Sequence, residues 1–207
     1  MEWRSDNPCD RIGPVFGPQG DIVQHMRALP HAEVAAAVET VRTSDSAAPV
    51  VRLAFEFLVL TAGRSAEVRL ATWEEMDVPG RVWTISAERM RAKREHRVPL
   101  CGPAVEVLDA ARARGDADLV FPMRSGRPVA ASTLPKMLQL HGIAAVAPGF
   151  RSSFRNWAAE RTDHPREVIE ATLAHVVTNK VEAAYARSDL FERRPLLMDD
   201  WAVYARL

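Results

Sequence analysis

Hydrophobic residues recur every three or four positions along most of this chain, a pattern typical of amphipathic α-helices. Residues 31 to 42 follow it, and residues 47 to 62 form a more apolar run that predicts a helix buried on most sides. Further helices are predicted over 103–114, 131–140 and 150–161. Residues 1–30 differ, because prolines and glycines recur there with little periodicity. That stretch is predicted to be a linker or an extended arm.

Strand-like composition is confined to the middle of the chain. Three short segments have it: 72–76, 82–85 and 96–100. Pro79 and Gly80 mark the first turn between them, and the stretch from Arg89 to Arg94 forms the second. The sequence therefore predicts a mostly α chain with one small antiparallel sheet. Its 207 residues suit one domain with a substantial hydrophobic core.

The formal net charge is zero, whereas a DNA-binding domain usually carries a basic excess. The basic residues are nevertheless unevenly distributed along the chain. Five of them crowd the second turn of the predicted sheet: Arg89, Arg91, Lys93, Arg94 and Arg97. A run of this kind is usually a solvated face.

Residues 149–187 contain three predicted helical segments, each of which ends in or carries a polar side chain. In the first, Arg151 flanks an apolar stripe. The second starts with Asp163 as N-cap and ends at His175, and the third places Tyr185 on or beside its apolar face. A fourth polar residue, Arg64, follows the glycine that ends the apolar helix.

Each of these residues, taken alone, has an ordinary structural explanation. A tyrosine such as Tyr185 usually belongs to the core, and a histidine at a helix C-terminus, such as His175, usually complements the helix dipole. Arg151 fits a surface residue whose stem covers apolar area. Arg64 fits an ion pair with Glu67.

Four segments taken together resemble a known family. TAGRSAEVRLATW, ERMRAKREHRVPL, GFRSSFRNWAAER and LAHVVTNKVEAAYARSDLFE are similar to the successive signature blocks of the tyrosine recombinases, specifically the phage-type integrases of bacteria. The resemblance runs from about His31 to Trp201 with the blocks in order. It implies the tyrosine-recombinase catalytic-domain fold and site-specific DNA recombination.

In this family a tyrosine attacks a DNA phosphodiester, forms a 3′-phosphotyrosyl link and releases a 5′-hydroxyl; rejoining reverses the step. The resemblance implies that Tyr185 is the nucleophile and that Arg64 and Arg151 bind the non-bridging phosphate oxygens. His175 matches a later His or Trp position. Because the phosphotyrosine stores the bond energy, no cofactor and no metal are expected.

Two positions depart from the family pattern. Pro148 stands where the family has the histidine of H-x-x-R, and proline has no proton to exchange there. Arg91 stands where close relatives have the general-acid lysine. Lys93, two residues later and on the same face of a strand, is predicted to replace it, with Arg91 and Arg94 contacting DNA. The alternative is a catalytically impaired remnant that binds DNA or a partner.

The resemblance also implies partners and organisation. Residues 1–30 are expected to follow an absent N-terminal DNA-binding domain, and 31–207 to form the catalytic domain. Double-stranded DNA and other integrase protomers in a tetrameric synapse are the expected partners, with no small-molecule substrate. No apolar run is long enough to span a membrane and no signal segment is evident, so a cytoplasmic location is expected. A C-terminal helix, with apolar residues at Leu197, Trp201 and Tyr204, packs either on its own domain or on a neighbouring protomer.

Overall fold

The structure, a computed structural model, describes residues 28–175 and 189–206. Most of them are helical. The longer helices are α2 (Val34–Arg42), α3 (Pro49–Thr61), α5 (Gly102–Arg112), α6 (Thr133–Leu140), α7 (Gly149–Arg161) and α10 (Arg194–Tyr204). Shorter ones are η2 (His31–Glu33), α4 (Ser65–Arg69), η3 (Trp73–Glu75), α8 (Arg166–Thr172) and η4 (Phe191–Arg193). The predicted helices at 31–42, 47–62, 103–114, 131–140 and 150–161 are thus confirmed, with no end shifted by more than three residues.

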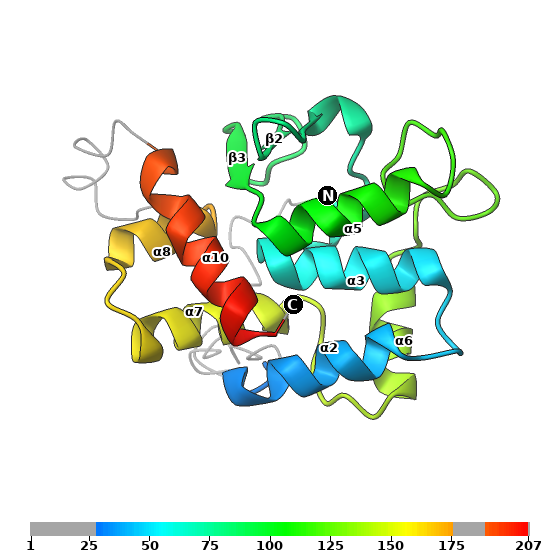
Figure 1. Cartoon of the computed structure of the whole chain (residues 1–207), viewed down its shortest axis with the longest axis horizontal. Helices are drawn as coiled ribbons and strands as arrows, with labels where there is room; N and C mark the ends of the chain where they lie inside the picture. The colour runs from blue at the N-terminus through cyan, green and yellow to red at the C-terminus, as the bar shows by residue number, and fades with distance from the viewer. Residues whose placement is uncertain (1–27, 176–188, 207) are drawn as a thin grey trace, which may run out of the picture.

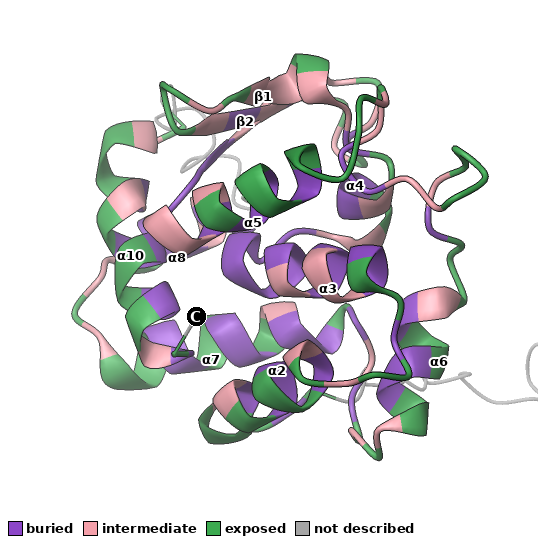
Figure 2. Ribbon diagram, turned by 45° about the vertical axis from the view of Figure 1, so that its right-hand side comes forward, coloured by how far each residue is buried: buried purple, intermediate pink, exposed green. Residues whose placement is uncertain are grey.

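Helix α3 is the centre of the fold, as its apolar run predicts. Figures 1 and 2 show it with α5 on one side and α2 on the other, and its buried positions reach almost all round the helix. The Phe57 ring lies 5.3 Å from Trp83 of the sheet and 5.4 Å from Phe121, measured between centroids. On the opposite side, Phe55 meets Phe150 of α7 edge to face at 5.1 Å. Through these contacts α3 joins the sheet to the C-terminal helices.

The sheet has three antiparallel strands in the order β1-β2-β3: Met76–Asp77, Val82–Ile85 and His96–Pro99. Trp83 pairs with Val98 in the register, and both side chains are buried. The strand predicted at 72–76 is confirmed only at Met76, because Trp73–Glu75 form a 3-10 turn. Thr72 and Glu75 cap that turn, and the Glu75 carboxylate accepts hydrogen bonds from Trp83 Nε1 (3.1 Å) and Arg89. These local bonds outweigh the extended preference of the segment.

Helix α10 packs on its own domain. Trp201 is fully buried, donates from Nε1 to the Val59 carbonyl at 2.8 Å, and lies 5.0 Å from the Trp157 ring. Pro195 is in the first turn of this helix, where its missing N–H costs no hydrogen bond, so it marks the start of the helix. The Trp201 side of the helix is therefore used within the chain.

Helix α8 starts later and ends earlier than the sequence predicts. Its N-cap is Pro165, which has extended ψ (139°), so Asp163 is not the cap. The helix ends at Thr172, and Ala174 adopts a left-handed conformation (φ 48°) that turns the chain away. His175 thus lies beyond the helix end. Tyr185 and the predicted third helix lie outside the described residues.

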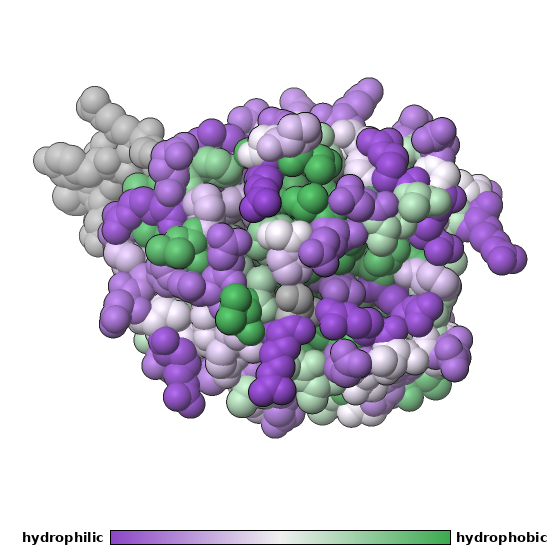
Figure 3. All heavy atoms as spheres, in the orientation of Figure 1, coloured by the Kyte–Doolittle hydropathy of each residue, from purple (hydrophilic) through white to green (hydrophobic). Residues whose placement is uncertain are grey.

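The surface seen in Figure 3 carries hydrophobic side chains in separate patches among hydrophilic ones. The exposed large hydrophobic residues among those described are Leu70, Leu140, Leu196 and Val203. Within 28–175 and 189–206, no helix has the length and apolar character needed to cross a membrane.

Candidate active site

Three of the predicted catalytic residues line one cavity of about 370 Å³: Arg64, Arg151 and His175. They come from three separate segments, at the start of α4, in the first turn of α7 and just after α8. The other residues that line the cavity are Ser65, Ala66, Arg91, Pro148, Ser152 and Arg155. Four guanidinium groups and one imidazole therefore surround a space large enough for a small anionic group.

Arg64 is fixed by the turn between α3 and α4. Its Nη1 donates to Glu67 Oε1 at 2.8 Å, and its backbone N–H donates to Oε2 of the same carboxylate at 2.7 Å. Gly63 makes this turn possible, because a Cβ there would lie 3.0 Å from Thr61 Oγ1 and 3.1 Å from Val68. The ion pair with Glu67 is therefore present, and it holds Arg64 beside the cavity.

Arg151 is held by the C-terminal ends of two helices. It donates from Nη1 to the Ala62 carbonyl after α3, and from Nη2 to the Leu173 carbonyl after α8 at 2.5 Å. Both carbonyls carry the negative end of a helix dipole, which favours a cation there. Burial, and then the nearby Arg64, lower the pKa of Arg151 to about 10. The guanidinium remains charged at neutral pH. An anion in the cavity would offset both the cost of its burial and its repulsion by Arg64.

His175 is oriented by a carboxylate of its own turn. Its Nδ1 lies 2.5 Å from Glu170 Oε2, and its backbone N–H donates to the Glu170 carbonyl at 3.0 Å. Ala174, in the left-handed region, makes the turn that brings the two side chains together. The ordinary explanation of a helix-end histidine is incomplete, because this imidazole also lines the cavity.

Two residues of the site were missed in the sequence. Arg155 lines the cavity, and its Nε donates to Glu170 Oε1 at 2.7 Å. The available signal was spacing, since Arg155 follows Arg151 by four residues and so shares its helix face. No spacing rule points to Glu170, because the pairing depends on how α8 lies against α7.

One protein-family model covers most of the chain. The model of the phage integrase family matches residues 27–190 of the chain. The chain belongs to the phage integrase family.

Individual relatives agree with that membership. Prophage integrase IntA of Escherichia coli (strain K12) is 34% identical over 201 residues, which cover 94% of this chain and 48% of IntA. The chain thus spans about half the length of this curated relative. Among solved structures, an integrase from mycobacterium phage Brujita has a TM-score of 0.62 at 18% identity, covering 95% of this chain and 63% of the other. A lambda integrase dimer bound to a COC′ core site has a TM-score of 0.56 at 16% identity, covering 78% and 59%. These likenesses confirm the recombinase catalytic fold.

The hairpin of this integrase-family domain places its basic residues differently from the prediction. Arg91 lines the cavity, whereas Lys93 does not. Lys93 is exposed in the turn between β2 and β3, with φ of 52° and Nζ 3.3 Å from the Glu88 carbonyl. The expectation that Arg91 and Lys93 share a strand face is wrong, because neither belongs to a strand. Arg94 is exposed in the same turn.

The remaining two arginines of the basic stretch make structural contacts. Arg89 binds the Glu75 carboxylate and donates to the Glu67 carbonyl at 2.6 Å. Arg97 of β3 makes a two-point ion pair with Asp189. The hairpin is therefore anchored at both strand ends, and its turn carries the exposed charges.

Pro148 also lines the cavity and is the N-cap of α7. Its φ of −62° and ψ of −24° are accessible to any residue, so the backbone does not require proline there. A second imidazole, that of His96 on β3, is half-buried in a positively charged setting. Burial, then Arg194 and Arg151, lower its pKa to about 3, which keeps it neutral.

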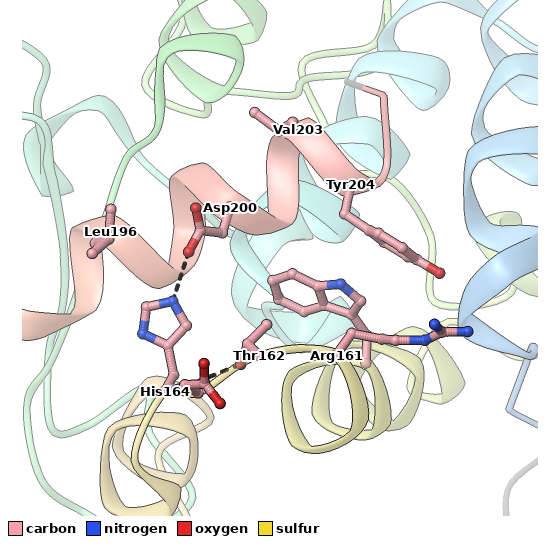
Figure 4. A pocket seen from close by; sticks show the side chains of 9 residues that line it. Arg161, Thr162, His164, Leu196, Asp200, Val203 and Tyr204 are labelled. Atoms are coloured by element: carbon pink, nitrogen blue, oxygen red, sulfur yellow. Dashed lines mark hydrogen bonds and ion pairs between the residues drawn. The ribbon is translucent and has the colours of Figure 1, made fainter.

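A larger cavity, of about 580 Å³, lies away from these residues, between the end of α7 and one face of α10. Figure 4 shows His164 and Asp200 pointing toward each other across it, with Nε2 and Oδ2 2.7 Å apart. None of the predicted site residues lines this cavity. The smaller cavity, with its four arginines, is therefore the candidate site, although it is not the larger of the two.

Proposed function

We propose that this chain is the catalytic domain of a site-specific integrase that cleaves and rejoins DNA through a 3′-phosphotyrosine on Tyr185. The observation that carries the proposal is the convergence of Arg64, Arg151 and His175 on one cavity. Membership of the phage integrase family supports it, because all three residues lie within the matched range, 27–190.

The arginine pair suits a phosphoryl-transfer transition state. Such a state gathers negative charge on its non-bridging oxygens, and rigid guanidinium groups stabilise it through charge-assisted hydrogen bonds. Arg64 is set by Glu67, and Arg151 by the Ala62 and Leu173 carbonyls, so little reorganisation is needed when phosphate binds. Each guanidinium has five N–H donors, so donors remain for an anion after these contacts.

The proposed nucleophile requires this positive setting. A tyrosine hydroxyl with a pKa near 10 is a weak nucleophile at neutral pH unless its proton is removed or its anion is stabilised. We expect Tyr185 to attack phosphorus and Lys93, on the exposed turn, to give a proton to the departing 5′-oxygen. Arg91 and Arg94 are expected to contact the DNA backbone.

Double-stranded DNA is the proposed substrate, and other integrase protomers are the proposed partners. The likeness to a lambda integrase dimer bound to a core site supports both. Phosphate contacts from the hairpin and cavity arginines would make binding fall steeply as salt rises.

A nicked duplex tests the proposal. When cleavage releases a short fragment that diffuses away, rejoining stops and protein stays attached to the 3′ end of the DNA. We expect a denaturation-resistant adduct that retains a label on the 3′-phosphate side and is absent with Tyr185→Phe. Binding of the duplex without an adduct would instead support the alternative of a DNA-binding remnant.

A further inference from the structure

The cavity of this domain is lined by an imidazole. A proline stands at the position where the family pattern has a second histidine. Of the described residues that line it, His175 is the one that carries an imidazole. Pro148, also in the lining, has no group that exchanges a proton. Under the proposed function, the hydroxyl of Tyr185 gives up its proton to a base during cleavage.

The state of His175 is set by Glu170. Oε2 of Glu170 lies 2.5 Å from His175 Nδ1, and its other oxygen, Oε1, accepts from Arg155 Nε at 2.7 Å. Burial opposes ionisation of Glu170, but the hydrogen bonds from His175 and Arg155 outweigh it and hold the pKa of this carboxyl below its usual range. The carboxylate is therefore the acceptor, and Nδ1 carries the proton.

We propose that Glu170 is a positioning residue that fixes the Nδ1–H tautomer of His175, so that Nε2 accepts the proton of Tyr185 during cleavage. Glu170 is half-buried and does not line the cavity, so it acts through the imidazole and not on the DNA. The inference rests on the proposed function. His175 then supplies base catalysis, and Glu170 and Arg155 hold its imidazole in place.

The step balances in atoms and charge. The Tyr185 oxygen forms a bond to phosphorus while its proton moves to His175 Nε2. The bond from phosphorus to the 5′-oxygen breaks, and that oxygen takes a proton from the Lys93 ammonium group. Rejoining runs the transfers backwards, which returns the proton to tyrosine and restores both side chains.

Arg155 supports the arrangement from the neighbouring helix. By binding Oε1 it leaves Oε2 for the imidazole and ties α8 to α7 beside Arg151. The carboxylate is thus held by a fixed partner on each oxygen, which limits the imidazole to one orientation. This use of a carboxylate behind a histidine is a general way to select a tautomer.

The test compares three full-length proteins: the unaltered chain, the Glu170→Gln variant and a matched control variant. A glutamine amide can donate to Nδ1 and so move the proton to Nε2, which removes the base. We expect the maximal single-turnover rate of adduct formation on a nicked duplex to fall by about 10- to 100-fold. The DNA concentration that gives half that rate should not change. Glu167→Gln is the control, because Glu167 lies on the same helix in an exposed ion pair with Arg193 (3.7 Å). Its adduct rate should equal that of the unaltered chain.

A double variant separates positioning from general support of the fold. On a His175→Ala background, Glu170→Gln should cause no further loss, because the residue through which it acts is gone. Losses that multiply would overturn the proposal, as would an unchanged maximal rate in folded Glu170→Gln. A lower melting temperature with the maximal rate intact would show that Glu170 only joins α7 to α8, which also overturns it. If the unaltered chain forms no adduct, the proposed function itself fails.

Discussion

Arg97 of β3 holds Asp189 through two parallel hydrogen bonds, from Nε to Oδ2 at 2.9 Å and from Nη2 to Oδ1 at 2.8 Å. The same guanidinium lies over the Phe191 ring, 4.3 Å from its centroid. The bond to Arg97 also holds the pKa of Asp189 below its usual range. Asp189 follows Tyr185 by four residues. This ion pair therefore anchors the chain just after the proposed nucleophile to the strand that ends the basic hairpin.

Loss of that anchor should slow cleavage more than it destabilises the fold. Both side chains are about two-fifths exposed, so the pair contributes less than about 1 kcal/mol to stability. We expect Arg97→Ala to lower the rate of adduct formation by about 10- to 100-fold, because misplacing a reacting group by about 1 Å costs that much. Thermal unfolding of the same protein should change little. The reversed pair, Arg97→Asp with Asp189→Arg, should recover part of the rate, and a rate unaffected by Arg97→Ala would refute the anchoring role.

Lys93 and Arg91 should differ in their response to the leaving group. A sulfur at the 5′-bridging position leaves as a thiolate, which needs no proton, whereas oxygen does. We expect Lys93→Ala to slow cleavage of the ordinary phosphodiester by about 10²-fold or more. The same variant should cleave the sulfur substrate at the rate of the unaltered chain. Arg91→Ala should slow both substrates alike, because a guanidinium acts there through charge. A Lys93→Ala defect of equal size on both substrates would remove Lys93 as the general acid.

His96 should make stability depend on pH. Its folded pKa is about 3 against an ordinary 6.5, because it is partly removed from water and lies near Arg194, Arg151 and Arg64. Between these values the unfolded chain binds a proton that the folded chain does not, so stability falls as pH falls below 6.5. The slope is at most about 1.4 kcal/mol per pH unit. Urea unfolding at pH 7 and pH 5 should show this loss, and His96→Gln should reduce it; an identical loss in both proteins would contradict the assignment.

Replacing Ala174 with glycine should stabilise the fold. Its φ of 48° is costly for a residue with a Cβ, whereas glycine adopts it readily. Ala174→Gly is therefore expected to raise the unfolding free energy by up to about 1 kcal/mol, measured by chemical denaturation. The matched control is Ala171→Gly inside α8, which should lower it by about 1 kcal/mol. The same sign for both substitutions would show that the turn before His175 is unstrained.

The sequence predicts the helices well because their apolar spacing reflects burial against α3. It fails over most of 72–76, where capping by Thr72 and Glu75 turns a strand-like segment into a 3-10 turn. The end of α8 is missed for a similar reason, since an alanine and not a glycine takes the left-handed position. Neither the capping hydrogen bonds nor the left-handed alanine changes the spacing of hydrophobic residues, so hydrophobic periodicity does not predict them.

For the site, the resemblance selects Arg64, Arg151 and His175, and the structure brings them to one cavity. Their supports come from distant segments: Arg155 lies on α7, and the Ala62 carbonyl, which Arg151 binds, follows α3. Such tertiary contacts have no signature in a single sequence. The zero net charge is equally uninformative, because it sums over the whole chain while the cavity gathers four arginines.

The most direct test of the account is to identify the residue that carries the DNA. After reaction with a nicked duplex, nuclease and protease digestion would leave a peptide bearing a nucleotide, whose attachment point is read by tandem mass spectrometry. The account predicts the nucleotide on Tyr185, linked through the 3′-phosphate, with Arg64→Lys and Arg151→Lys each reducing its yield. Attachment at any other residue, or no modified peptide from protein shown to be folded and bound to the duplex, would contradict it.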